Sequence, residues 1–108
     1  MSISSLLEEL QRLISLSEKG NNALYDAEVK LAELENKLDL TENKAFVRAS
    51  GSVAERTALA RLEAAEIRFE RDVAKAEVNR VKAKIKSVEQ AIMATQTMAK
   101  LTELEARL

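Results

Sequence analysis

Apolar residues recur along the first fifty positions at alternating spacings of three and four, which is the period of a coiled-coil helix. The a positions of this heptad series are Ile3, Leu10, Ser17, Leu24, Leu31, Leu38 and Ala45, and the d positions are Leu6, Leu13, Gly20, Ala27, Leu34, Thr41 and Arg48. The phase holds through Gly20-Asn21-Asn22, a typical helix stop and restart. One continuous helix, two collinear helices, and a first helix that folds back at Gly20 into a three-helix bundle are all compatible with this segment.

A second heptad series follows a short turn at residues 50–52. Gly51 suits a backbone reversal, and Ser52 with Glu55 forms a capping-box pattern at the start of a helix. The second series has Thr57, Ala64, Arg71, Val78, Ile85, Ile92 and Ala99 at a, and Ala60, Ile67, Ala74, Val81, Val88 and Thr95 at d. The sequence therefore predicts an all-α fold, a long antiparallel coiled-coil helical hairpin in one domain over residues 1–108, with arm one at about 3–50 and arm two at about 52–102.

The charges beside the heptad core predict the antiparallel orientation. Between residues 28 and 44 the e positions of arm one carry Glu and the g positions carry Lys, whereas between residues 61 and 82 the e positions of arm two carry Arg or Lys and the g positions from 63 to 77 carry Glu. Antiparallel packing sets e against e and g against g, so every pair joins opposite charges. The predicted pairs are Glu42 with Arg61, Glu35 with Arg68, Glu28 with Lys75, Lys37 with Glu63, and Lys30 with Glu70.

Arg71 is a charged residue at an a position of the second arm. Such a residue can fix register or oligomeric state inside a coiled coil. Alternatively, the side chain reaches around the core to Glu35 or Asp72.

Composition narrows the chemistry that the chain can perform. It has 108 residues with 3% aromatics and contains no Cys, His, Trp or Pro. Without Cys or His there is no thiol nucleophile, imidazole base or structural zinc site, and no glycine-rich phosphate loop occurs. We therefore expect a protein that is not an enzyme and uses no cofactor or metal. It shows no signal peptide or membrane span, and we expect a cytoplasmic location.

Several apolar residues fall outside the predicted core. They are Leu59, Leu62, Phe69 and Val73 on arm two, Leu40, Phe46 and Val47 near the turn, and Leu7, Ile14, Leu16, Met93 and Met98 toward the open end. A two-helix hairpin has a thin core, so a homo-oligomer that buries these residues is one interpretation. A docking face for a different protein is the other.

Basic residues form two clusters along the chain. One surrounds the turn at Lys44, Arg48 and Arg56, and the other comprises Arg80, Lys82, Lys84 and Lys86. Both can be solvated faces of helices. Both can also track phosphates, because clustered Lys and Arg bind nucleic acid in a salt-dependent way.

The segment from Lys44 to Lys100 resembles small helical proteins that are common in bacteriophage genomes and, more distantly, the UvsY type of phage recombination mediator. The most specific piece is Gly51-Ser52-Val53-Ala54-Glu55-Arg56. The resemblance implies that Lys44 and Arg48 contact DNA and that the helix around Val88, Ile92 and Met93 drives assembly.

The expected function is accordingly that of a non-catalytic, oligomeric phage accessory protein in DNA recombination. It would bind single-stranded DNA or a recombinase in the cytoplasm of an infected bacterium. The alternatives are a protein-binding adaptor or inhibitor without a nucleic-acid role, and a structural coiled coil that binds only itself.

Overall fold

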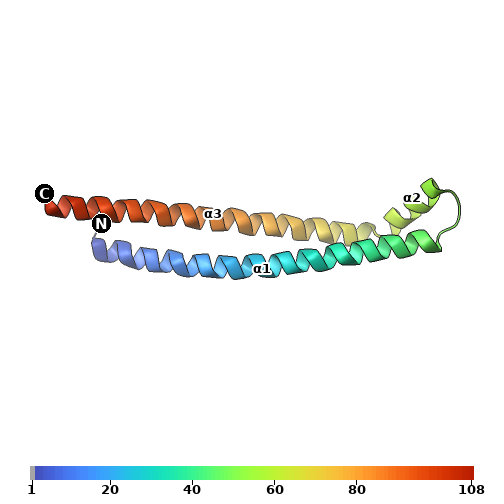
Figure 1. The fold of residues 1–108 in the computed structure, drawn as a ribbon, viewed down its shortest axis with the longest axis horizontal. Helices are drawn as coiled ribbons and strands as arrows, with labels where there is room; N and C mark the ends of the chain where they lie inside the picture. The colour runs from blue at the N-terminus through green and yellow to red at the C-terminus, as the bar shows by residue number, and fades with distance from the viewer. Residues whose placement is uncertain (1) are drawn as a thin grey trace. The chain divides into compact units, whose positions relative to one another are not determined.

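The computed structural model describes residues 2–108 and contains three helices in this range, α1 (Ile3–Arg48), α2 (Val53–Glu63) and α3 (Ala65–Arg107) (Figure 1). No strand occurs among these described residues, which confirms the all-α class. The chain divides into two compact units. The terminal unit comprises Met1–Tyr25 with Arg80–Leu108, and the turn unit comprises Asp26–Asn79.

The terminal unit pairs the beginning of α1 with the end of α3 in antiparallel orientation (Figure 1). Its buried side chains are Leu6, Leu13, Val81 and Thr95, all at predicted core positions. Thr95 is the polar member of this set, and its hydroxyl donates a hydrogen bond to the Ala91 carbonyl at 2.8 Å. This bond satisfies the hydroxyl inside an otherwise apolar layer.

Helix α1 continues without interruption through Gly20. A Cβ built on Gly20 would lie 2.9 Å from Cγ1 of Ile85 on α3, so the missing side chain is what lets the two helices approach here. Gly20 therefore serves packing between helices rather than helix termination. Of the three outcomes that the sequence left open, the structure has the single continuous helix, and the predicted possible break at Gly20 is wrong.

The turn unit contains the rest of α1, the turn, α2 and the start of α3. Helix α1 ends at Arg48, two residues before the predicted end of arm one. Gly51 has a φ of 113°, which confirms the predicted glycine-dependent reversal. Ser52 caps α2, because its hydroxyl accepts a hydrogen bond from the Glu55 amide at 3.2 Å.

Burial follows the predicted heptads closely. From Leu6 to Ala99, every predicted a or d residue is buried or half-buried except Arg48 and Thr57, which both lie beside the turn. The fully buried members of the turn unit are mostly small or branched aliphatic residues: Leu38, Ala45, Ala60, Ala64, Ala74 and Val78. The heptad assignment is thus confirmed within each unit.

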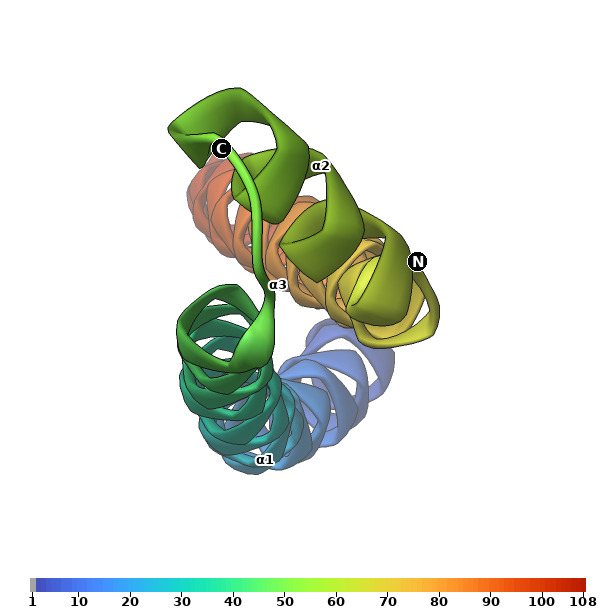
Figure 2. The same ribbon diagram turned by 90° about the vertical axis from the view of Figure 1, so that its right-hand side faces the viewer.

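The second arm is not the single helix that the sequence predicted. It breaks at Ala64, whose φ of −92° and ψ of 5° depart from helical values, and α3 begins at the next residue. Figures 1 and 2 show α2 set at an angle to the start of α3. The Arg68 guanidinium donates a hydrogen bond to the Arg61 carbonyl at 3.2 Å. This bond satisfies a backbone carbonyl beside the break.

The ion pairs between α1 and the second arm differ from the predicted ones, and one of them uses Arg48, a predicted core residue. Arg68 pairs with Glu42 rather than with Glu35, and Glu63 pairs with Arg48 at 2.6 Å rather than with Lys37. The predicted pair of Glu42 with Arg61 is therefore wrong as well. Side chains on a helix lean toward its N-terminus, so in an antiparallel pair those of the second arm lean toward the turn and those of α1 lean away from it. Each residue of the second arm therefore pairs with an α1 residue that lies closer to the turn than the α1 residue directly opposite it.

Arg71 follows the second of its two predicted alternatives. Its Nε lies 2.8 Å from a carboxylate oxygen of Asp72, and the side chain is only partly exposed. The guanidinium thus leaves the core and is neutralised at its edge.

Candidate interaction surfaces

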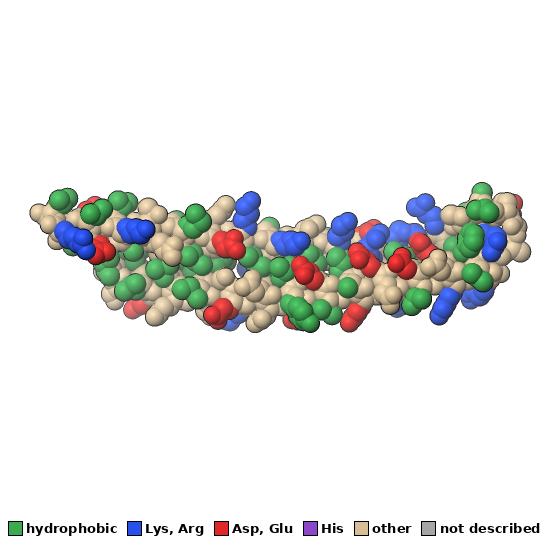
Figure 3. Space-filling model, viewed as in Figure 1, with side chains coloured by type: hydrophobic (Ala, Val, Ile, Leu, Met, Phe, Trp, Pro, Cys, Tyr) green, Lys and Arg blue, Asp and Glu red, His purple; other side chains and the backbone are tan. Residues whose placement is uncertain are grey.

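Four large apolar side chains of the turn unit point away from the core of α2 and α3. Leu59 is 51% exposed, Leu62 75%, Phe69 69% and Val73 53%. They follow one another at spacings of three, seven and four, so they occupy the c and f positions of the heptad, opposite the a and d core. We call these four residues the outer stripe. Their predicted exposure is confirmed, and Figure 3 shows hydrophobic side chains gathered over the end that carries α2.

The same heptad positions of α1 are mostly polar. Within the turn unit they hold Asp26, Glu33, Asn36 and Asn43, with apolar residues only at Val29, Leu40 and Val47. The outer face of α1 therefore mixes polar and apolar residues, whereas that of α2 and α3 holds one polar residue, Glu66, between Leu59 and Val73. A solvated outer face is the ordinary condition of a coiled-coil helix, and the apolar face of α2 and α3 departs from it.

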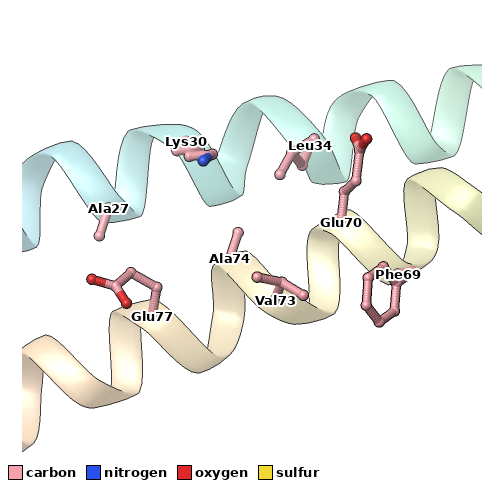
Figure 4. Close-up of a pocket in the computed structure, with 8 residues that line it drawn as sticks. All are labelled: Ala27, Lys30, Leu34, Phe69, Glu70, Val73, Ala74 and Glu77. Atoms are coloured by element: carbon pink, nitrogen blue, oxygen red, sulfur yellow. The ribbon is translucent and has the colours of Figure 1, made fainter.

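A groove of about 750 Å³ lies between α1 and α3 in the turn unit. Figure 4 shows Ala27 and Leu34 of α1 pointing toward α3, with Ala74 of α3 pointing back toward α1. Both alanines are core residues that end at Cβ, so they leave space that a larger pair would fill. Phe69 and Val73 of the outer stripe line the same groove, which joins the stripe to an apolar floor.

Charged residues form the rim of this groove. Lys30 stands on the α1 side, and Glu70 and Glu77 stand on the α3 side. In Figure 4 the Glu70 carboxylate extends toward α1, whereas the Phe69 ring lies on the side of α3 that is turned away from α1. The groove therefore combines an apolar floor, an exposed aromatic ring and carboxylates from α3.

The basic residues at the turn are engaged within the molecule. The Arg56 guanidinium lies 4.3 Å from the centroid of the Phe46 ring, and its Nε donates to the Phe46 carbonyl at 3.1 Å. Arg48 is paired with Glu63. Lys44 lines a shallower groove of about 520 Å³ with Val47 and Arg48. Of the three residues predicted to contact DNA here, two hold the turn together.

The other basic cluster lies on α3 in the terminal unit, where Arg80, Lys82, Lys84 and Lys86 are all exposed. A spacing of two residues turns a helix by about 200°. Lys82 and Lys86 therefore share one flank, and Arg80 and Lys84 share another. The cluster that looks continuous in the sequence is divided between two faces.

The predicted interface residues of the terminal unit are only partly exposed. Leu7, Ile14, Met93 and Met98 are exposed, whereas Leu16 and Ile92 are half-buried. Ile92 is an a residue and belongs to the intramolecular core. Two further exposed leucines, Leu101 and Leu104, lie near the end of α3 and were not predicted as interface residues, although their spacing of three continues the c and f positions.

The described residues hold few features of a reactive site. No group of His, Cys, Asp and Glu within residues 2–108 is arranged to hold a metal ion. Hydrogen bonding from Arg12 lowers the pKa of the exposed Glu9 carboxyl, and the same contact raises the pKa of Arg12. No helix in this range is long and apolar enough to cross a membrane.

No protein-family model matches this chain, and neither does a curated protein or a solved structure. The resemblance to phage recombination mediators therefore stays a prediction from the sequence.

Proposed function

We propose that this protein is a non-catalytic coiled-coil module that binds a helix of another protein chain through the outer stripe. The observation that carries the proposal is the exposure of Leu59, Leu62, Phe69 and Val73 at heptad spacing. Leu59 and Leu62 lie on α2 and Phe69 and Val73 lie on α3, so the stripe offers an apolar pair on each side of the break at Ala64. Amphipathic helices dock by burying apolar residues at such spacings.

The size of these side chains makes the binding energetically reasonable. Full burial of a Leu, Val or Phe side chain contributes about 1.5–3 kcal/mol. Micromolar affinity corresponds to about 8 kcal/mol, and association also opposes binding through lost rotational and translational freedom. Because the four side chains are already partly buried, they supply only part of this energy, and apolar contacts in the adjoining groove must add to it; Phe69 is the largest single contributor.

Tryptophan fluorescence tests this function directly, because the chain has no Trp of its own. The Phe69→Trp variant would be titrated with a panel of amphipathic helical peptides of different charge. A matched Asn36→Trp variant carries the reporter on the polar face of α1. We expect a saturable blue shift only in the Phe69→Trp variant, and the absence of any shift at micromolar peptide would contradict the proposal.

Binding of single-stranded DNA is the second candidate, and one observation favours it. Lys82, Lys84 and Lys86 are exposed in the terminal unit and form no ion pair with any residue in the range 2–108. Such lysines release counterions when they neutralise phosphates. On this proposal the protein acts as an accessory factor in phage recombination, as the sequence resemblance implies. Homo-oligomerisation likewise stays a prediction.

A further inference from the structure

Carboxylates surround the outer stripe. Glu66 occupies the c position between Leu62 and Phe69 and lies in the stripe itself. Because each residue of a helix is rotated by about 100° from the one before it, Glu63 and Glu70 border the stripe on one side and Asp72 borders it on the other. Glu63 and Asp72 are paired with Arg48 and Arg71, whereas Glu66 and Glu70 are exposed and have no recorded ion pair with the rest of the described chain.

The basic residues of the same helices either lie away from the stripe or are engaged within the molecule. Arg56 of α2 occupies a g position on the same border as Glu63, but its guanidinium lies 4.3 Å from the centroid of the Phe46 ring. Arg61, Arg68 and Lys75 occupy e positions, about 130° around the helix from the centre of the stripe. Arg68 is also held by Glu42. On α1, Lys30 is the cation that faces the groove, and it stands on the rim opposite Glu70. The stripe is thus an apolar surface whose border on α3 is acidic.

We infer that the outer stripe and the adjoining groove of the turn unit form the docking site for a cationic amphipathic helix of a different protein. This inference rests on the proposed function and specifies the partner's chemistry. Lys or Arg residues that flank the partner's apolar face would meet Glu66 and Glu70. A large apolar side chain of the partner would enter the space left by Ala27 and Ala74, while Phe69 offers a contact on the side of α3 turned away from α1.

A second copy of this chain is a poor occupant of the same surface. If two outer stripes packed against each other in antiparallel orientation, the flank with the unpaired Glu70 would face its own copy, and Glu66 of each copy would lie within the apolar interface. A parallel arrangement would likewise enclose two copies of Glu66. Like charges across an interface oppose association, and a partner with cationic flanks neutralises these carboxylates.

The test uses three labelled peptides of about 18 residues, or about five helical turns. They share one leucine-rich face and differ only in having Lys, Gln or Glu beside it, and each is titrated into the full chain by fluorescence anisotropy. We expect the Lys peptide to bind about tenfold more tightly than the Gln peptide at low salt, and the Glu peptide to bind most weakly. The preference should shrink at physiological salt because exposed charges are screened.

Three variants locate the site. Phe69→Ser should weaken binding of every peptide about tenfold or more, because it removes the largest apolar contact. Joint substitution of Glu66→Lys and Glu70→Lys should reverse the order of the three peptides. Glu33→Lys changes an exposed acid at the c position of α1 and should leave the affinities unchanged. Circular dichroism of each variant verifies that the helices are retained.

The possible failures separate the two proposals. Binding that needs Phe69 but favours the Gln or Glu peptide would overturn the cationic partner and leave helix binding intact. If no peptide binds, helix binding fails together with the inference. Binding of the Lys peptide that survives Phe69→Ser would place the site elsewhere. Self-association in sedimentation equilibrium that Phe69→Ser abolishes would show that a second copy covers the stripe.

Discussion

At the scale of single residues, Gly20 shows how packing can override helix propensity. Replacing a helical Gly by Ala on an exposed surface stabilises a helix by about 1 kcal/mol. At Gly20 the new Cβ would lie 2.9 Å from Cγ1 of Ile85, close to the branched and stiff base of that side chain. We expect Gly20→Ala to destabilise the protein by about 1–2 kcal/mol net, because overpacking costs about 1–3 kcal/mol.

A double-mutant cycle measured by urea denaturation separates these two effects. In an Ile85→Ala background the obstructing atom is gone, so Gly20→Ala should become stabilising by about 1 kcal/mol. If Gly20→Ala already stabilises the otherwise unchanged chain, the close approach of the helices at this residue is wrong.

A second feature at the residue scale is the ion pair of Arg68 with Glu42, which replaces the predicted pair of Arg68 with Glu35. Both side chains are at most about one-third exposed, at 25% and 32%. We expect Glu42→Gln to lower the free energy of unfolding by about 1 kcal/mol, since a charge-assisted hydrogen bond is lost. Glu35→Gln, which removes the partner that the sequence predicted for Arg68, should change it by much less. Equal effects of the two substitutions in thermal unfolding would argue against the Glu42 contact.

At the scale of secondary-structure elements, α2 is the weakest part of the turn unit. It has 11 residues, and Ala60 is its only buried member. Elements with few buried contacts open locally before the molecule unfolds. We therefore expect the amides of α2 to exchange hydrogen much faster than those of α3 around Ala74 and Val78, in measurements by mass spectrometry or nuclear magnetic resonance.

The N-cap of α2 allows this element to be perturbed alone. Ser52→Ala removes the hydroxyl that accepts from the Glu55 amide, at a cost of about 1 kcal/mol. Exchange in α2 should accelerate about fivefold, while exchange in α3 stays unchanged. Ser50→Ala is the matched control, because Ser50 lies in the turn and caps no helix. Acceleration throughout the turn unit would mean that α2 does not open independently.

The elements also show what the sequence could and could not predict. Heptad spacing identified the core because burial repeats with the helix, and it identified the outer stripe as what remains outside that core. Nothing in the sequence predicts the helix break at Ala64, because the segment Leu62-Glu63-Ala64-Ala65 consists of good helix formers without Gly or Pro. The groove was not predicted either, because it forms where the small side chains of Ala27 and Ala74 lie opposite each other on the two helices. The ion pairs were displaced by the lean of long side chains, which the order of residues does not reveal.

At the scale of the whole molecule, charge divides between the two units. The turn unit holds twelve acidic and nine basic residues, and the terminal unit holds six acidic and eight basic residues. A cationic helix and an anionic nucleic acid would thus be attracted to different units. The second candidate function can therefore be tested without disturbing the outer stripe.

Anisotropy of a labelled single-stranded oligonucleotide, titrated from low to physiological salt, measures that candidate. Three lysine contacts give a slope of log affinity against log salt of about −2, because each phosphate contact on a single strand contributes about −0.7. Two triple variants remove equal charge from the two units: Lys82→Gln with Lys84→Gln and Lys86→Gln, and Lys30→Gln with Lys37→Gln and Lys75→Gln. We expect the first to reduce binding at least tenfold and the second to preserve most of it. Equal losses would indicate attraction to overall charge rather than a site, and no binding of the unchanged protein at low salt would contradict a role in handling single-stranded DNA.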